Sequence, residues 1–71
     1  MAFEYEITQH IATLSESGNV SKELNKVSYN GAAAKYDLRT WRRTEDGVQL
    51  LKGLTMTDEE IQILRDALNN L

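Results

Sequence analysis

Four stretches of the chain alternate apolar and polar side chains with the two-residue period of β-strands, and they are rich in β-branched and aromatic residues. They span residues 5–14, 22–30, 34–43 and 48–56. The second stretch begins with the helix-forming residues Lys22–Leu24, but Val27–Tyr29 favour extended backbone. The pattern therefore predicts four strands.

Turn residues separate the predicted strands. Gly18-Asn19 follows the first, Asn30-Gly31 the second and Thr44–Gly47 the third. Asn-Gly is a strong signal for a hairpin between antiparallel strands. Near the end of the first stretch the apolar side chains change parity, at Ala12 and Leu14. Such a change within one strand predicts a bulge or a bend.

The C-terminal segment has the pattern of an amphipathic helix. Thr57 and Glu60 have the spacing of a capping box, and Asp58 and Glu59 add negative charge to the first turn, where it suits the helix dipole. An apolar stripe then recurs at steps of three and four residues, at Ile61, Leu64, Leu68 and Leu71, widened by Ile63 and Ala67. The stripe is wider than a small sheet requires, so we expect part of it to contact a second chain.

These elements predict an α+β fold, a four-stranded antiparallel sheet followed by one C-terminal helix, in a single domain over residues 1–71. One helix covers only one face of such a sheet, so the other face is solvated or binds a ligand. A chain of 71 residues without cysteine has no disulfide to stabilise it. We therefore expect self-association to supply additional buried area.

The sequence offers little for catalysis or metal binding. There is no cysteine, and we interpret the single histidine, His10, as structural or surface-exposed. No nucleophile motif or phosphate-binding loop is present, so we expect a non-enzymatic protein without cofactor or metal. No apolar run is long enough to span a membrane, and the N-terminal "MAFEYE" carries acids where an export signal needs positive charge. We expect a cytoplasmic protein, with association with the nucleoid as a further option.

Charge is distributed unevenly along the chain. The net charge is −3, but residues 22–52 hold seven of the eight basic residues and four of the eleven acids, a net +3. The remaining residues hold one basic residue and seven acids, a net −6. This asymmetry predicts a basic face and an acidic face on one domain.

The basic residues concentrate in Lys35–Arg43, "KYDLRTWRR", which also contains the only tryptophan. Side chains alternate across a strand. We interpret one parity, which holds Ala34, Tyr36, Leu38 and Thr40, as the core face. The other parity holds Lys35, Asp37, Arg39, Trp41 and Arg43, and the neighbouring strands would extend it sideways through Lys22, Lys26 and Lys52. Within this set we expect Asp37 to orient Arg39 or Lys35.

Cations interleaved with an aromatic ring suit single-stranded nucleic acid. The cations neutralise phosphates, and the ring stacks on an unpaired base, whose face a duplex hides. The residues alone leave a second interpretation equally open, a solvated strand face whose Trp41 is half buried at a dimer contact. Tyr29 likewise is either a stacking platform or a strand residue that packs on its neighbours.

Three motifs add a resemblance that extends over nearly the whole chain. "KELNKVSYN", "KYDLRTW" and "LKGLTMTDEE" resemble the bacterial YdbC family, which is similar in fold to the eukaryotic transcriptional coactivator positive cofactor four. The most specific part is Asp37-Leu38-Arg39 with Trp41, followed by Lys52–Thr55 and an acidic helix start. The resemblance implies a four-stranded sheet with one helix, a homodimer joined through the helices, and binding of single-stranded DNA without enzymatic activity.

Transferred to this sequence, the family's binding surface would comprise Lys22, Lys26, Tyr29, Lys35, Arg39, Trp41 and Lys52. The chain departs from the coactivators at Arg42, where they carry a second aromatic residue, so a phosphate contact would replace one stacking contact. The loop at Thr44–Leu51 is acidic and not glycine-rich. Two other functions remain open, RNA binding through the same face and a protein-interaction adaptor that uses the sheet edge or the acidic helix.

Overall fold

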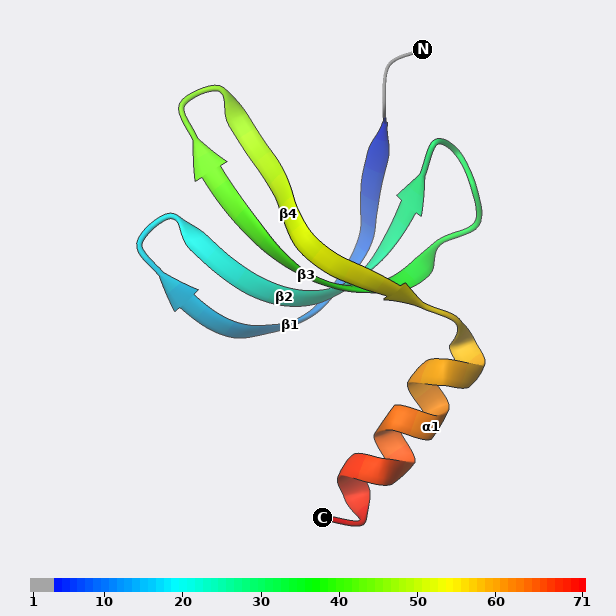
Figure 1. Cartoon of the computed structure of the whole chain (residues 1–71). Helices are drawn as coiled ribbons and strands as arrows, with labels where there is room; N and C mark the ends of the chain where they lie inside the picture. The colour runs from blue at the N-terminus through cyan, green and yellow to red at the C-terminus, as the bar shows by residue number, and fades with distance from the viewer. Residues whose placement is uncertain (1–3) are drawn as a thin grey trace.

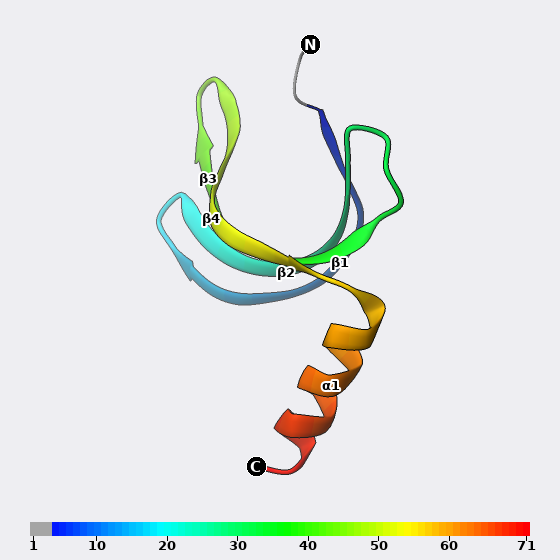
Figure 2. The ribbon, with the colours of Figure 1, turned by 45° about the vertical axis from the view of Figure 1, so that its right-hand side comes forward.

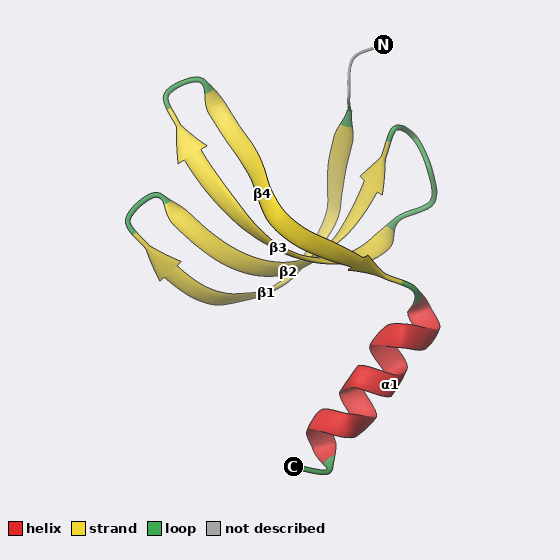
Figure 3. Ribbon diagram, viewed as in Figure 1, coloured by secondary structure: helices red, strands yellow, loops and turns green. Residues whose placement is uncertain are grey.

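The computed structural model describes residues 4–71, so the first three residues of "MAFEYE" lie outside it. Four strands form one antiparallel sheet in the order β1-β2-β3-β4, and one helix follows (Figures 1 and 3). The elements are β1 (Tyr5–Ser17), β2 (Val20–Tyr29), β3 (Lys35–Thr44), β4 (Gly47–Met56) and α1 (Asp58–Asn69). The predicted α+β fold is therefore confirmed.

The predicted turns join consecutive strands. Gly18-Asn19 links β1 to β2, with Gly18 at a φ of 59°. Asn30 and Gly31 both have positive φ, 52° and 78°, a conformation that glycine and asparagine tolerate best. Asn30 also fixes the start of β1, because its Oδ1 accepts a hydrogen bond from the Glu4 amide at 2.9 Å and its own amide donates to the Glu4 carbonyl at 2.8 Å.

The sheet is strongly bent, so that it has a concave and a convex face (Figures 1 and 2). The predicted bulge in β1 is confirmed, since the pairing of β1 with β2 shifts register three times. As a result Ile7 lies opposite Val27, whereas Ile11 lies on the other face beside Leu24. A fourth shift falls between β3 and β4, next to Gly53. A Cβ on Gly53 would lie 2.6 Å from the Arg39 Cβ, so this close approach requires glycine.

Most of the buried side chains lie on the concave face. Among the described residues it holds Val27, Trp41, Ser21, Glu23, Asn25 and Asp37, all at most 8% exposed. The expectation that Ala34, Tyr36, Leu38 and Thr40 form the core face is therefore wrong, because these residues are only partly buried. Bending crowds the side chains on the inside of a sheet and spreads those on the outside, which decides which parity is buried.

The helix α1 lies on the convex side of the sheet and extends away from it (Figures 1 and 2). Its predicted capping box is confirmed, since Thr57 Oγ1 accepts from the Glu60 amide at 3.1 Å and Glu60 Oε1 accepts from the Thr57 amide at 2.8 Å. No residue of α1 is buried. Within residues 4–71, none of the helical structure has the length and apolar character needed to cross a membrane.

Candidate nucleic-acid interface

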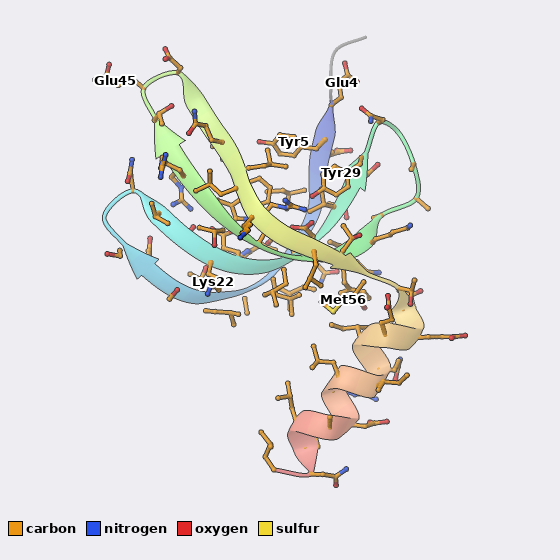
Figure 4. All side chains as sticks on the ribbon, viewed as in Figure 1. Glu4, Tyr5, Lys22, Tyr29, Glu45 and Met56 are labelled. Carbon is orange, nitrogen blue, oxygen red and sulfur yellow. The ribbon has the colours of Figure 1, made fainter. Side chains whose placement is uncertain are left out.

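The eight residues predicted to bind nucleic acid lie on two opposite faces of the sheet. Lys22 pairs with Thr40 and Lys26 with Tyr36, so both lysines lie on the convex face. Figure 4 shows Lys22 outside the bend and Tyr29 inside it. The convex face holds Lys22, Lys26 and Lys52, and the concave face holds Tyr29, Lys35, Arg39, Trp41 and Arg43. The prediction of one continuous surface is therefore wrong, because it ignored the parity of β2 relative to β3.

Trp41 does not project from an uncovered face. Its side chain is only 2% exposed, and its ring centroid lies 5.6 Å from that of Tyr5, which reaches in from β1 (Figure 4). The indole Nε1 is buried and has no hydrogen-bond partner among the described residues. The expectation of an exposed stacking ring is corrected accordingly, and the bend of the sheet is the cause, since it folds β1 over this part of β3.

The predicted link between Asp37 and Arg39 is present. The fully buried Asp37 carboxylate accepts hydrogen bonds from Arg39 Nη2 at 3.0 Å and from the Tyr29 hydroxyl at 2.7 Å, while Arg39 Nη1 donates to the Leu51 carbonyl. The hydrogen bond to Asp37 raises the pKa of Arg39 above its ordinary value. Burial and the same carboxylate raise the pKa of Tyr29 to about 12. Arg39 is therefore held in place and paired with an acid.

A second carboxylate organises the other half of the concave face. Glu23 accepts hydrogen bonds from Ser21 at 2.6 Å, from Asn25 at 3.3 Å and from Arg43 at 3.1 Å. His10 Nδ1 lies 2.6 Å from Asn25 Oδ1, which joins β1 to this cluster. Burial alone would raise the pKa of Glu23, but the hydrogen bonds from Ser21 and Asn25 and the nearby positive charges outweigh it, so the pKa lies below its ordinary value.

The concave face therefore has few cations left for a ligand. Within residues 4–71 the ion pairs join Asp37 to Arg39 and Glu23 to Arg43, and His10 Nδ1 lies 3.5 Å from Glu23 Oε1, all on this face. An arginine already paired with a carboxylate neutralises a phosphate less effectively, because the carboxylate repels the phosphate. Of the predicted cations here, the exposed Lys35 at the start of β3 is the one without an ion pair in the described part of the chain.

The lysines of the convex face have no acidic partner within residues 4–71. Lys22 and Lys52 flank a groove of about 560 Å³, which we call the lysine groove. Its lining comprises Lys22, Leu38, Arg39, Thr40, Lys52, Gly53 and Leu54. Neither lysine takes part in an ion pair with any residue of the described range. Arg42 has the same parity as Thr40 and is exposed, so it extends the positive charge along β3.

Lys26 is placed differently from the other two lysines of this face. Its Nζ lies 5.0 Å from the centre of the Tyr36 ring, a cation–π contact. Tyr36 in turn lines a second groove, of about 300 Å³, between the sheet and α1. We call it the helix groove, and its lining comprises Ile11, Leu24, Tyr36, Ile61, Gln62, Leu64, Arg65 and Leu68. Lys26 therefore belongs to the edge of the helix groove.

Comparison with known proteins shows a relative of this chain. A protein of Treponema pallidum (strain Nichols), described as uncharacterized, is 47% identical over 70 residues, which cover 97% of this chain and 80% of that protein. The chain belongs to the same family as this Treponema protein. No family model matches the chain.

Sequence reasoning missed the polar residues that fill the concave face. Ser21, Glu23 and Asn25 occupy one parity of β2, and polar residues at alternate positions indicate a solvated face unless the sheet is known to bend. Tyr5 was also missed as a partner of Trp41, because the two residues are far apart in the sequence. Among residues 4–71 no group of three or more His, Asp or Glu side chains is arranged to hold a metal ion.

Proposed function

We propose that this protein binds single-stranded DNA without catalysis and with little sequence preference, and that the lysine groove provides the phosphate contacts. The observation that carries the proposal is the pair of exposed lysines, Lys22 and Lys52, which flank an apolar groove and have no acidic partner in the described part of the chain. Cations that are not already paired release the most counterions when they bind phosphate.

The floor of the lysine groove suits unpaired bases. Leu38 and Leu54 line it, and Leu54 is 53% exposed. An unstacked base presents an apolar face that is buried favourably against leucine side chains, whereas a duplex keeps these faces inside its stack. Apolar contacts do not distinguish the hydrogen-bonding edges of the bases, so sequence preference is expected to be weak.

The resemblance of the sequence to the YdbC family supports the same proposal. Lys52 is part of the resemblance, and Arg42, which stands where coactivators carry a second aromatic residue, is exposed on the same face as Lys22. A phosphate contact by Arg42 would extend the interface along β3. The cellular setting would be transcription, replication or repair, in the cytoplasm or at the nucleoid.

We also propose that α1 joins two copies of the chain into a homodimer. The helix buries none of its residues, and Leu64 and Leu68 remain 38% and 57% exposed beside the helix groove. An apolar face of this kind on so small a domain marks an association surface. Sedimentation equilibrium is expected to give twice the chain mass, and a monomer at all accessible concentrations would contradict this assignment.

Fluorescence anisotropy with a labelled oligo-dT tests the DNA interface. The double variant K22Q/K52Q is expected to bind more weakly and to reduce the slope of log affinity against log salt by about 0.7 per lysine. K35Q, which removes a predicted cation on the concave face, is the matched control and should change little. A larger loss for K35Q than for K22Q/K52Q would place the interface on the concave face instead.

Competition experiments separate the alternative functions. A duplex of the same sequence should compete poorly with the single strand. A matched RNA that competes better than DNA would indicate RNA binding, since only RNA offers the 2′-hydroxyl. No binding to any nucleic acid, together with nuclease-resistant capture of one protein, would favour the adaptor.

A further inference from the structure

The turn between β2 and β3 contains a dipeptide that can change covalently without any enzyme. In Asn30-Gly31 the amide nitrogen of Gly31 can attack the side-chain Cγ of Asn30 and close a succinimide ring. Glycine favours this attack, because it has no side chain to shield its amide nitrogen. Asn-Gly occurs once in the sequence, so the chemistry selects one asparagine of this chain.

The fold leaves both residues accessible. Asn30 and Gly31 are exposed, and a Cβ on Gly31 would meet no atom of the described residues within 4 Å. The Ala32 amide closes the turn by donating to the Tyr29 carbonyl at 3.0 Å, whereas the Gly31 amide donates no backbone hydrogen bond within residues 4–71. The attacking nitrogen is therefore not held by a competing backbone acceptor in this part of the chain.

Asn30 also attaches the start of β1 to the turn. Its Oδ1 accepts a hydrogen bond from the Glu4 amide at 2.9 Å, and its own amide donates to the Glu4 carbonyl at 2.8 Å. Figure 4 shows Glu4 at this end of β1, an edge strand that pairs only with β2 among the described strands. A covalent change at Asn30 therefore acts directly on the attachment of β1.

We propose that Asn30 is a site of spontaneous modification, and that its conversion to isoaspartate releases the start of β1. The Gly31 nitrogen gives up its proton to water and bonds to Asn30 Cγ. The bond between Cγ and Nδ2 breaks, and the leaving nitrogen takes a proton from water and departs as ammonia. A water molecule then opens the succinimide at either carbonyl, which gives aspartate or isoaspartate.

Isoaspartate alters the turn more than aspartate does. The main chain then passes through Cβ and Cγ, so the former side-chain carbonyl joins the peptide bond to Gly31 and no longer holds the Glu4 amide from its original place. The new carboxylate also adds negative charge to a surface groove of about 170 Å³, whose lining includes Glu4 and Glu6. Aspartate adds the charge but keeps the length of the turn and the side-chain acceptor. This inference does not depend on the proposed binding of DNA.

Peptide mapping by mass spectrometry tests the site. The protein and a synthetic peptide of residues 28–33 are incubated in the same neutral buffer until the peptide is fully converted. The protein should lose the Asn30 amide, seen as the mass gain from amide to acid. Asn19 is the matched control, because it is also exposed in a turn but is followed by Val20, and it should keep its amide. Retention of the Asn30 amide would overturn the site, and equal loss at Asn19 would overturn the role of the Gly31 amide.

Hydrogen exchange tests the release of β1. In the incubated protein the amides of residues 5–7 should exchange faster than in fresh protein, while those of β3 stay unchanged and exclude global unfolding. Fresh N30D, in which aspartate tolerates the φ of 52°, should remain close to the fresh wild type. Treatment with protein isoaspartyl methyltransferase and S-adenosylmethionine, which converts isoaspartate to aspartate, should slow the exchange again. Unchanged exchange in protein that carries isoaspartate at position 30, or fast exchange that repair does not slow, would overturn the release.

Discussion

The two faces of this sheet show how bending decides which residues become a core. On the concave face Asp37 and Asn25 are completely buried although both are polar, and Trp41 is 2% exposed. On the convex face Leu54 is 53% exposed although it is apolar, and the adjoining helix buries none of its residues. Polarity alone would expose Asp37 and Asn25 and bury Leu54. The inside of the bend therefore holds most of the buried side chains of the single chain, and the outside leaves apolar side chains exposed.

The largest expected effect follows from truncation of Trp41 on the concave face. W41A should lower the free energy of unfolding by about 3–5 kcal/mol, the usual cost of replacing a buried tryptophan by alanine. A chain of this size has little more than that in total. Urea denaturation followed by circular dichroism measures the effect.

V48A provides the matched control for W41A, because Val48 is an apolar residue that is 48% exposed on β4. V48A should lower the free energy of unfolding by less than about 1 kcal/mol. If W41A were no more damaging than V48A, the concave face would not be the core. The same denaturation curve gives the fraction of W41A that is folded. That fraction has to be known before weaker DNA binding by W41A is attributed to the missing side chain.

The next largest effect should come from the buried ion pair. D37N keeps the shape of the side chain but leaves the Arg39 guanidinium, whose side chain is 17% exposed, without its carboxylate. We expect the free energy of unfolding to fall by about 2–4 kcal/mol, because removal of one partner leaves the other charge unpaired in a poorly solvated site. D46N, in the exposed turn between β3 and β4, is the control and should be neutral within error.

A double-mutant cycle with R39Q sharpens the interpretation of D37N. If Asp37 acts mainly through Arg39, the double variant D37N/R39Q should be more stable than the sum of the two single losses predicts. Strict additivity would mean that Asp37 acts through Tyr29 instead, to which it is bonded at 2.7 Å.

The sequence alone was sufficient to predict the strands, the turns and the helix, but not which face of the sheet is buried. Local signals specified the four strands, the turns and the capping box, because each depends on residues a few positions apart. Lys35, Arg39 and Trp41 share one face as predicted, and Lys35 is exposed there. The predicted exposure of Trp41 was wrong, because exposure depends on curvature, which arises from register shifts between strands that are distant in the sequence. The parity change at Ala12 and Leu14 predicted the bulge, but a bulge alone does not reveal which face becomes the inside.

Acid should destabilise the concave face to a smaller extent. The pKa of Glu23 in the folded protein lies below its ordinary value of 4.5, so the unfolded chain binds the proton more readily. The stabilisation from Glu23 is therefore complete above about pH 5 and decreases as the pH falls through the folded pKa. Urea denaturation measures the free energy of unfolding between pH 7 and pH 3. This free energy should fall less steeply with pH for E23Q than for the wild type, and an equal pH dependence in both proteins would contradict the role of Glu23.

The smallest effect on the single chain is expected at the convex face, in the helix. Leu68 is 57% exposed and lines the helix groove, so L68S should cost less than about 1 kcal/mol at a protein concentration where the wild type is monomeric. I63S is the control, because Ile63 is 69% exposed and is not among the residues that line the helix groove. At higher concentration L68S alone should shift the sedimentation profile towards the monomer, since Leu68 would then lose a partner copy. If monomeric L68S lost as much unfolding free energy as W41A, α1 would already belong to the core of the single chain. The distinction between the two faces would then no longer hold.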